Sequence, residues 1–94
     1  MSKVERDCVR VLRASAPDCC LEATVKECRP WASALFVGHR LTISVAADED
    51  SRLDDWLVTL PETELTWPGH FAASVDVIER RANAATIELL IVES

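Results

Sequence analysis

The clearest pattern of hydrophobic and polar positions lies in the last third of the chain. Two segments there alternate between apolar and polar residues, which is the period of a β-strand with one buried face. We therefore predict a closing β-hairpin in which Phe71–Glu79 pairs with Ala85–Glu93, with Asn83 at positive φ in the turn. Leu90 and Val92 break the alternation, which indicates that this strand is central, or that a helix or a partner subunit covers its second face.

Earlier in the chain, three further segments predict strands. Residues 20–28 alternate and are interrupted by the Arg-Pro pair at 29–30, because a proline lacks the N–H that a strand ladder uses. The apolar segment Ala32–Val37 predicts a more buried strand. Its spacing from the alternating segment Leu41–Ala47 predicts a hairpin, with a tight turn at the Gly-His pair at 38–39.

Residues 3–14 predict a helix, because their apolar residues recur at the spacing of one helical face. These residues are Val4, Cys8, Val11 and Leu12. Ser2 and Glu5 fit a capping box at the start of this helix. The alternation of Val9 with Val11 leaves a strand over residues 8–13 as the alternative.

A second, shorter helix is predicted to follow the acidic residues after position 47 and to stop before Pro61. Its apolar residues form one stripe, as on a helix with one buried face. They are Leu53, Trp56, Leu57 and Leu60. Ser51 and Asp54 match a helix N-cap pattern. Residues 62–70 are predicted to be a loop, in which Trp67-Pro68-Gly69 forms a turn.

The order of predicted elements is helix, strand, strand, strand, helix, strand, strand. Strands joined by short turns form an antiparallel sheet. We therefore predict an α+β fold: a small antiparallel sheet of four to five strands, with one or two helices packed on one face, ending in a β-hairpin. A chain of 94 residues has the length of one domain, which we assign to residues 1–94.

Composition narrows the class of protein. Hydrophobic residues make up 49% of the chain and charged residues 28%, which is typical of a globular domain rather than a disordered one. The first residues contain no apolar segment like that of a secretory signal, and no apolar run approaches the length of a membrane span. We expect a cytoplasmic protein whose four cysteines are reduced and serve mainly in core packing. These are Cys8, Cys19, Cys20 and Cys28.

The net charge of −6 belongs entirely to residues 48–64, which contain seven acidic residues and one basic residue. One interpretation is a solvated helix face whose acids stabilise the helix N-terminus. The sharper hypothesis is a docking surface for a basic protein partner, because clustered charge of one sign raises association rates and rejects wrong partners. The predicted contact residues are Asp48, Glu49, Asp50, Asp54, Asp55, Glu62, Glu64 and Trp67. The same charge argues against direct binding of nucleic acid.

No motif in the chain predicts a reaction. There is no G-x-S-x-G, and the two glycines cannot form a phosphate-binding loop. His39 and His70 lie in predicted turns, away from the cysteines in sequence, and the cysteine spacing lacks the usual zinc knuckle. The acids at 48–54 lack the glycine and distal glutamate of a calcium loop. We expect no catalytic residue, no metal ligand and no cofactor.

The sequence thus predicts a non-catalytic interaction or regulatory protein that presents an acidic helix to a basic partner. It would act in a complex, or as a homo-oligomer joined through a sheet edge or the last strand. One alternative is a phage-type or immunity-type inhibitor that presents its acids as a mimic of nucleic acid. Another is a domain that binds a small ligand or a metal through Trp67, His70 and the cysteines.

Overall fold

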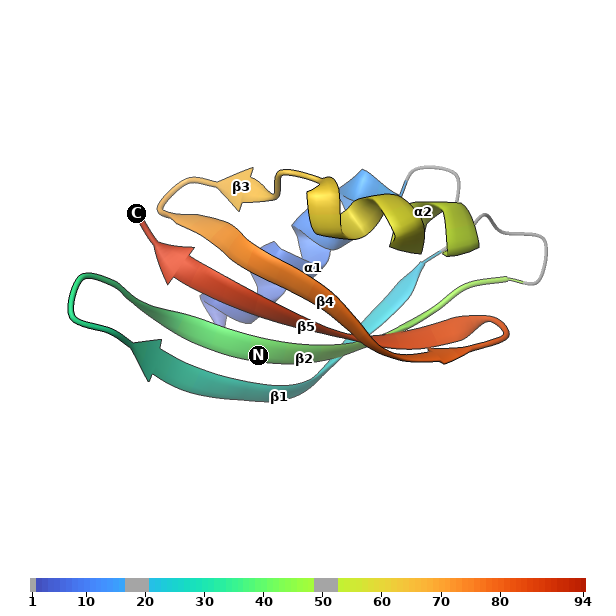
Figure 1. The fold of residues 1–94 in the computed structure, drawn as a ribbon, viewed down its shortest axis with the longest axis horizontal. Coiled ribbons are helices and arrows are strands. Elements are labelled where there is room, and N and C mark those ends of the chain that lie inside the picture. The colour runs from blue at the N-terminus through green and yellow to red at the C-terminus, as the bar shows by residue number, and fades with distance from the viewer. Residues whose placement is uncertain (1, 17–20, 49–52) are drawn as a thin grey trace.

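The computed structural model describes residues 2–16, 21–48 and 53–94 of the chain. The elements are α1 (Lys3–Ser15), β1 (Glu22–Ala32), β2 (Val37–Ala46), α2 (Leu53–Thr59), the 3-10 helix η1 (Leu60–Glu62), β3 (Thr66–Trp67), β4 (His70–Arg81) and β5 (Ala84–Glu93). The strands form one antiparallel sheet in the order β1-β2-β5-β4-β3 (Figure 1). The predicted α+β class, with two helices, five strands and a closing hairpin, is confirmed.

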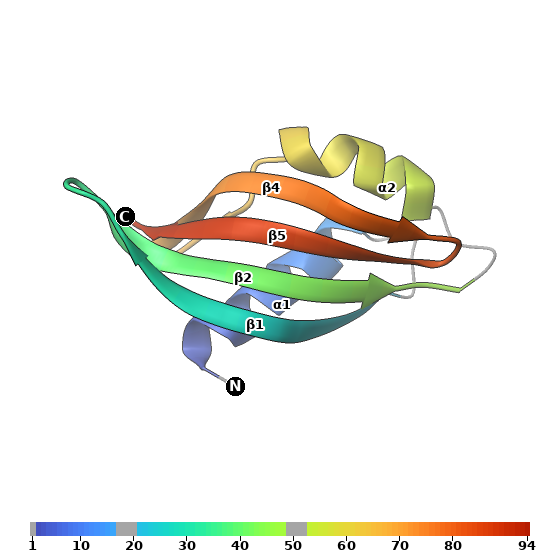
Figure 2. The ribbon, with the colours of Figure 1, turned by 60° about the horizontal axis from the view of Figure 1, so that its bottom comes forward.

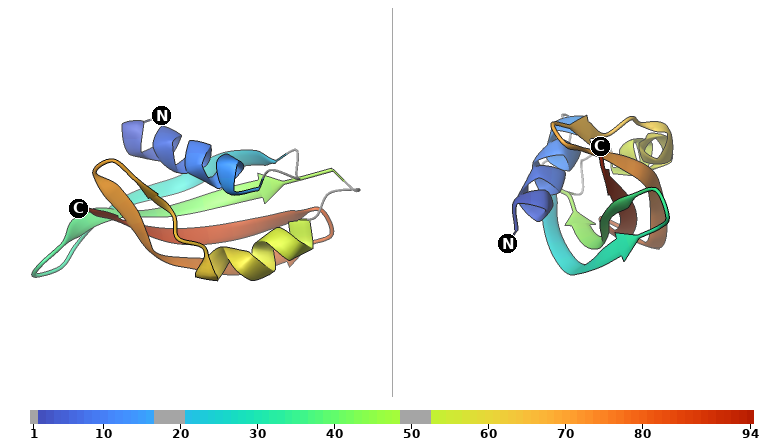
Figure 3. Two further views of the ribbon diagram at one scale, coloured as in Figure 1. Left: turned by 90° about the horizontal axis from the view of Figure 1, so that it is seen from above. Right: turned by 90° about the vertical axis from the view of Figure 1, so that its left-hand side faces the viewer.

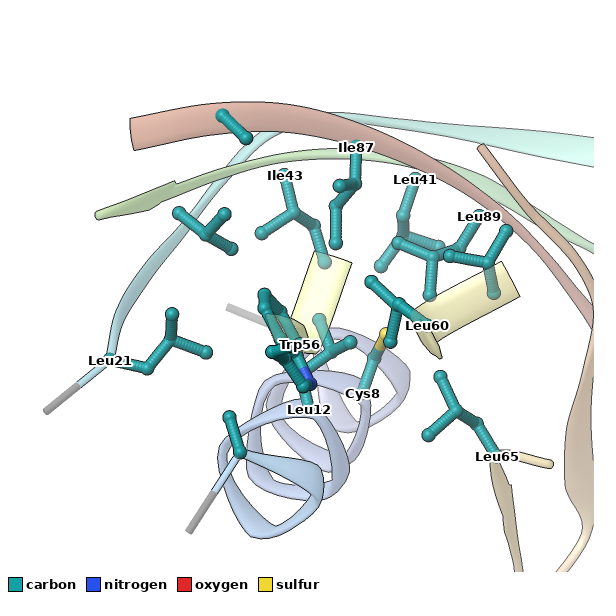
Figure 4. Close-up of a cluster of buried hydrophobic side chains, with 14 of the residues drawn as sticks. Cys8, Leu12, Leu21, Leu41, Ile43, Trp56, Leu60, Leu65, Ile87 and Leu89 are labelled. Atoms are coloured by element: carbon teal, nitrogen blue, oxygen red, sulfur yellow. The ribbon is translucent and has the colours of Figure 1, made fainter. Parts of the chain in front are cut away.

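Both helices pack on one face of the curved sheet (Figure 3). Between them and the sheet lies a single cluster of buried side chains, in which the strand residues point toward the helices (Figure 4). The most completely buried members are Leu12, Leu41, Ile43, Val45, Leu60, Ile87, Leu89 and Ile91. This packing uses the predicted alternation, because every second residue of a strand faces the same side of the sheet.

Helix α1 confirms the predicted helix and excludes the alternative strand. The hydroxyl oxygen of Ser2 accepts a hydrogen bond from the N–H of Glu5 (3.3 Å), which caps the N-terminus. At the other end, the hydroxyl of Ser15 donates to the carbonyl of Leu12 (2.7 Å) and accepts from the indole N–H of Trp56 (2.9 Å). Because Trp56 belongs to α2, this bond ties the two helices together. Within the described ranges, no helix is long and apolar enough to cross a bilayer.

Helix α2 confirms the predicted second helix, and its whole apolar stripe is buried. Leu60, the last member of the stripe, begins the 3-10 turn that contains Pro61. The predicted cap at Ser51 falls outside the described residues. In the next segment, Gly69 has a φ of 87°, as the predicted turn requires, while Thr66–Trp67 adds a short strand to the predicted loop.

The closing hairpin is confirmed as the pairing of β4 with β5, and β5 lies in the centre of the sheet. The prediction that this strand is central, which explains the apolar residues Leu90 and Val92, is therefore correct. Neither helix lies over that face of the sheet (Figure 2). Val92 is nonetheless only 3% exposed, because its row of side chains across the strands contains Trp31 and Phe71 on either side.

Three details of the predicted strands are wrong. The closing turn does not place Asn83 at positive φ, since Gly69 is the only described residue with positive φ. The first hairpin turns at residues 33–36 and not at Gly38-His39, which lie inside β2. The interruption predicted at Pro30 is also absent. Strand β1 continues through Pro30, because β1 is an edge strand and the proline nitrogen, which has no hydrogen to donate, can face the open side.

Candidate functional site

The β1–β2 hairpin ends in an apolar turn that projects at one end of the longest axis of the molecule, which is 43 Å long (Figure 1). No residue from Pro30 to Gly38 carries a charge. Leu35 is 85% exposed, Phe36 48% and Val37 51%. Single exposed apolar residues are ordinary on protein surfaces, but three in succession on one projection are typical of a contact surface. We call residues 34–37 the apolar tip.

Ser33 determines the shape of this turn. Its backbone N–H donates to the carbonyl of Phe36 (2.7 Å), and its hydroxyl oxygen accepts from the N–H of Phe36 (3.2 Å). These bonds close the turn on itself directly beyond the last strand pair, Ala32 with Val37. A turn that is ordered before it meets a partner loses little conformational entropy on binding. The tip is therefore built as a preformed apolar projection.

A hollow of about 340 Å³ lies at the base of the apolar tip. It is lined by Pro30, Trp31, Ala32, Val37, Gly38, His39 and Glu93. Catalysis would require a nucleophile beside a base, and this lining contains no hydroxyl or thiol group. Among the described residues, no three His, Cys, Asp or Glu side chains are grouped as a metal ion requires. The hollow therefore adds apolar surface to the tip and offers no reactive group other than His39 and Glu93.

The predicted acidic contact residues lie on α2, η1 and the segments beside them. Asp48, Asp54, Asp55, Glu62 and Glu64 are all exposed, while Glu49 and Asp50 fall outside the described residues. Asp54 forms an ion pair with Arg80 of β4. The other four form no ion pair with any described residue. They form an acidic surface that faces solvent.

Trp67 does not belong to that surface. Its side chain is only 8% exposed and joins the core cluster. Its ring stacks on His70, with ring centres 5.8 Å apart and planes at 23°. A binding anchor must reach its partner, and the structure places Trp67 in the core instead of on the acidic surface. The same stacking shows that the structure brings together Trp67 and His70, two residues of the predicted ligand-binding alternative.

The described cysteines lie in or beside the core. Cys8 is 1% exposed, and burial, together with the neighbouring Cys28, raises the pKa of its thiol to about 12. Cys28 is half-buried, and its pKa is raised by burial and by the carboxylate of Glu5. Because the thiolate is the reactive form, neither is activated as a nucleophile. The predicted packing role is confirmed for Cys8, while Cys19 and Cys20 fall outside the described residues.

Reading the sequence by periodicity missed the apolar tip. A run of consecutive apolar residues predicts a buried strand, and this run is instead the end of a hairpin. The signal that was present is Ser33, a residue that closes turns through its hydroxyl group. Comparison of the chain with protein-family models, curated proteins and solved structures gives no match.

Proposed function

We propose that this chain is a non-catalytic protein-interaction module that inserts its apolar tip into a pocket of a partner protein. The observation that carries the proposal is the exposure of Leu35, Phe36 and Val37 on one ordered projection. The chemistry of the partner follows from the absence of charged residues between Pro30 and Gly38. Its pocket would be apolar and uncharged, because an unpaired charge facing this tip would be buried at high cost.

The size of the tip decides what shape of partner it needs. Burying a large apolar side chain contributes about 1.5–3 kcal/mol, and association costs at least about 4 kcal/mol in lost freedom of motion. A flat surface that touched only the three exposed side chains would therefore bind weakly. A concave partner would also cover Trp31 and the hollow beside it. We therefore infer a pocket or groove that encloses the hairpin end.

The acidic surface supports a second candidate function, which is the docking of a basic partner. The specific observation is that Asp48, Asp55, Glu62 and Glu64 are exposed and unpaired among the described residues. Helix α2 and the apolar tip lie toward opposite ends of the long axis (Figure 1). The two surfaces would thus serve separate contacts. Salt-sensitive competition with nucleic acid for a basic enzyme would identify the inhibitor version of this candidate.

Site-specific photocrosslinking in native cells tests the proposal. Benzoylphenylalanine would replace Phe36 in one variant and Val58 in the other. Val58 is the matched control for the tip, since it is 78% exposed on α2, away from the hairpin end. We expect a discrete crosslinked species from position 36 that is lost when Leu35→Ser is added and that position 58 does not give. A partner of the acidic surface would crosslink to position 58 as a different species. The same crosslinked species from both positions would refute the proposal.

The acidic surface is tested separately by reversing Asp50, Asp54 and Asp55 to Lys. If the acids dock a basic partner, binding of that partner is lost while the fold and the crosslink from position 36 remain. If binding is unchanged, the acids serve only to solvate α2 and stabilise its N-terminus.

A further inference from the structure

A shallow groove of about 330 Å³ runs between α1 and β1. Its lining consists of Arg6, Val9, Arg10, Arg13 and Ala23. The three arginines recur at i, i+4 and i+7, so they share one face of α1. Val9, which is 7% exposed, and the half-buried Ala23 form an apolar floor beneath them. Figure 3 (left) shows α1 lying along β1 in this region.

The charges in this groove are only partly compensated. Asp7 pairs with Lys3 (2.9 Å) and with Arg10 (3.3 Å), so it neutralises Arg10 in part. Arg6 and Arg13 form no ion pair with any residue that the structure describes. Guanidinium groups bind carboxylates through paired, charge-assisted hydrogen bonds. The groove therefore suits a ligand that carries carboxylates at regular spacing.

Strand β1 is the edge of the sheet on this side, and its outward backbone groups meet no described strand. Natural edges are protected by bulges, charges and prolines. Here the bulge, at Lys26, and Pro30 both stand after residue 25 of β1. Residues 22–25, which lie beside the arginine groove, have a regular ladder with no bulge and no proline. Their one charged side chain, Glu22, lies on the face opposite Ala23 of the groove. This half of the edge is open to an additional strand.

We propose that residues 22–25 and the arginine groove together bind an extended acidic segment of a partner protein. The segment would pair with the open edge of β1 and direct alternate carboxylates at the arginines. Arg6 and Arg10 are four positions apart, about 6 Å along the helix axis, which is close to the distance of about 6.8 Å between alternate residues of a strand. Arg13 lies about 4.5 Å further along the axis, within reach of the next carboxylate because an arginine side chain is long and flexible. A second copy of this chain is a poorer occupant, because no described strand carries two acids at alternate positions.

The test measures binding by fluorescence anisotropy with a labelled nine-residue peptide that alternates glutamate and threonine. A matched peptide carries N-methyl groups on alternate residues, which removes half of the backbone donors and keeps the charges. The protein variants are Arg6→Gln/Arg13→Gln and, as the control, Arg29→Gln/Arg40→Gln. The control removes the same charge from two exposed arginines on the other face of the sheet. Glutamine is a good helix former, so the groove variant should keep α1 folded.

We expect the acidic peptide to bind the natural protein and the control equally, and the groove variant at least tenfold more weakly. The N-methylated peptide should bind at least fivefold more weakly than its parent. Four outcomes would overturn the proposal: no binding at millimolar concentration, equal loss in the control, undiminished binding of the N-methylated peptide, or salt-sensitive self-association that the peptide displaces. Leu35→Ser should leave peptide binding unchanged, which separates this proposal from that for the apolar tip.

Discussion

Gly38 lies inside β2, between Trp31 of β1 and Val92 of β5. A Cβ atom at this position would lie 1.9 Å from the carbonyl oxygen of Ile91 and 3.0 Å from the Cα of Val92. Both neighbours are backbone atoms of the central strand, so no side chain rotation relieves the contact. We therefore expect Gly38→Ala to force β2 away from β5 at this end of the sheet.

The structure indicates the size of the effect. Ordinary van der Waals contact begins at 3.4 Å, so the two backbones must separate locally by about 1.5 Å. That shift disrupts one or two ladder hydrogen bonds, at about 1 kcal/mol each. Crowding of a packed region adds about 1–3 kcal/mol. We expect the free energy of unfolding to fall by about 2–5 kcal/mol in total.

Urea denaturation measures this loss, and Gly69→Ala is the internal control. Gly69 has a φ of 87° but no atom within 4 Å of its Cβ position, so its substitution carries a backbone cost alone, of about 1–2 kcal/mol. Asparagine tolerates that conformation better than alanine does. Gly69→Asn should therefore recover stability relative to Gly69→Ala, whereas Gly38→Asn should not recover relative to Gly38→Ala. If Gly38→Ala were no more destabilising than Gly69→Ala, the steric reasoning would be refuted.

Three further predictions concern the core and are measured by urea denaturation. Ser15→Ala leaves the indole N–H of Trp56 without its partner and should lower the free energy of unfolding by about 1–3 kcal/mol. If the double variant Ser15→Ala/Trp56→Phe lost the sum of the two single losses, this hydrogen bond would not be the cause. The pKa of the Cys8 thiol is raised from 9.0 to about 12 in the folded protein. Above pH 9 this thiol therefore loses its proton in the unfolded chain while it keeps its proton in the folded protein. Stability should then fall by up to about 1.4 kcal/mol per pH unit between pH 9 and 12, and Cys8→Ala should lack this component. Leu89→Ala should cost about 2–5 kcal/mol, but Leu90→Ala less than about 1 kcal/mol. A similar cost at both positions would indicate that something covers the outer face of β5.

The sequence predicted best the elements in which local pattern and tertiary burial agree. The stripe of α2 and the alternation of Leu41, Ile43 and Val45 all point into the core, and the structure buries each of these side chains. The N-cap of α1 was also predictable, because a cap depends on residues three apart in the chain. Such features need no knowledge of which strands become neighbours.

The errors arise where the neighbouring strand decides the outcome. Pro30 breaks a strand that is paired on both sides, but it is tolerated in β1, which lies at the edge of the sheet. Gly38 was predicted to turn the chain, yet its function is to leave room for the backbone of β5. Trp67 follows an acidic segment in a predicted loop, but pairing of β3 with β4 draws it into the core. Local periodicity does not indicate which strands become neighbours in the sheet, so none of these three outcomes could be predicted from the sequence pattern.

Two parts of the chain contain more apolar residues than the inner face of the sheet uses, and periodicity cannot distinguish them. One is the end of β5, where Val92 lies in a central strand with neighbours on both sides. Its row includes two aromatic residues, which cover it within the same molecule. The other is the apolar tip, which begins at the last strand pair, extends beyond it, and has no such neighbours. An apolar run in the centre of a sheet is satisfied by the fold, whereas the same run at the end of a hairpin is left for a partner. That difference in position is the reason that we place the proposed contact at the tip and not on β5.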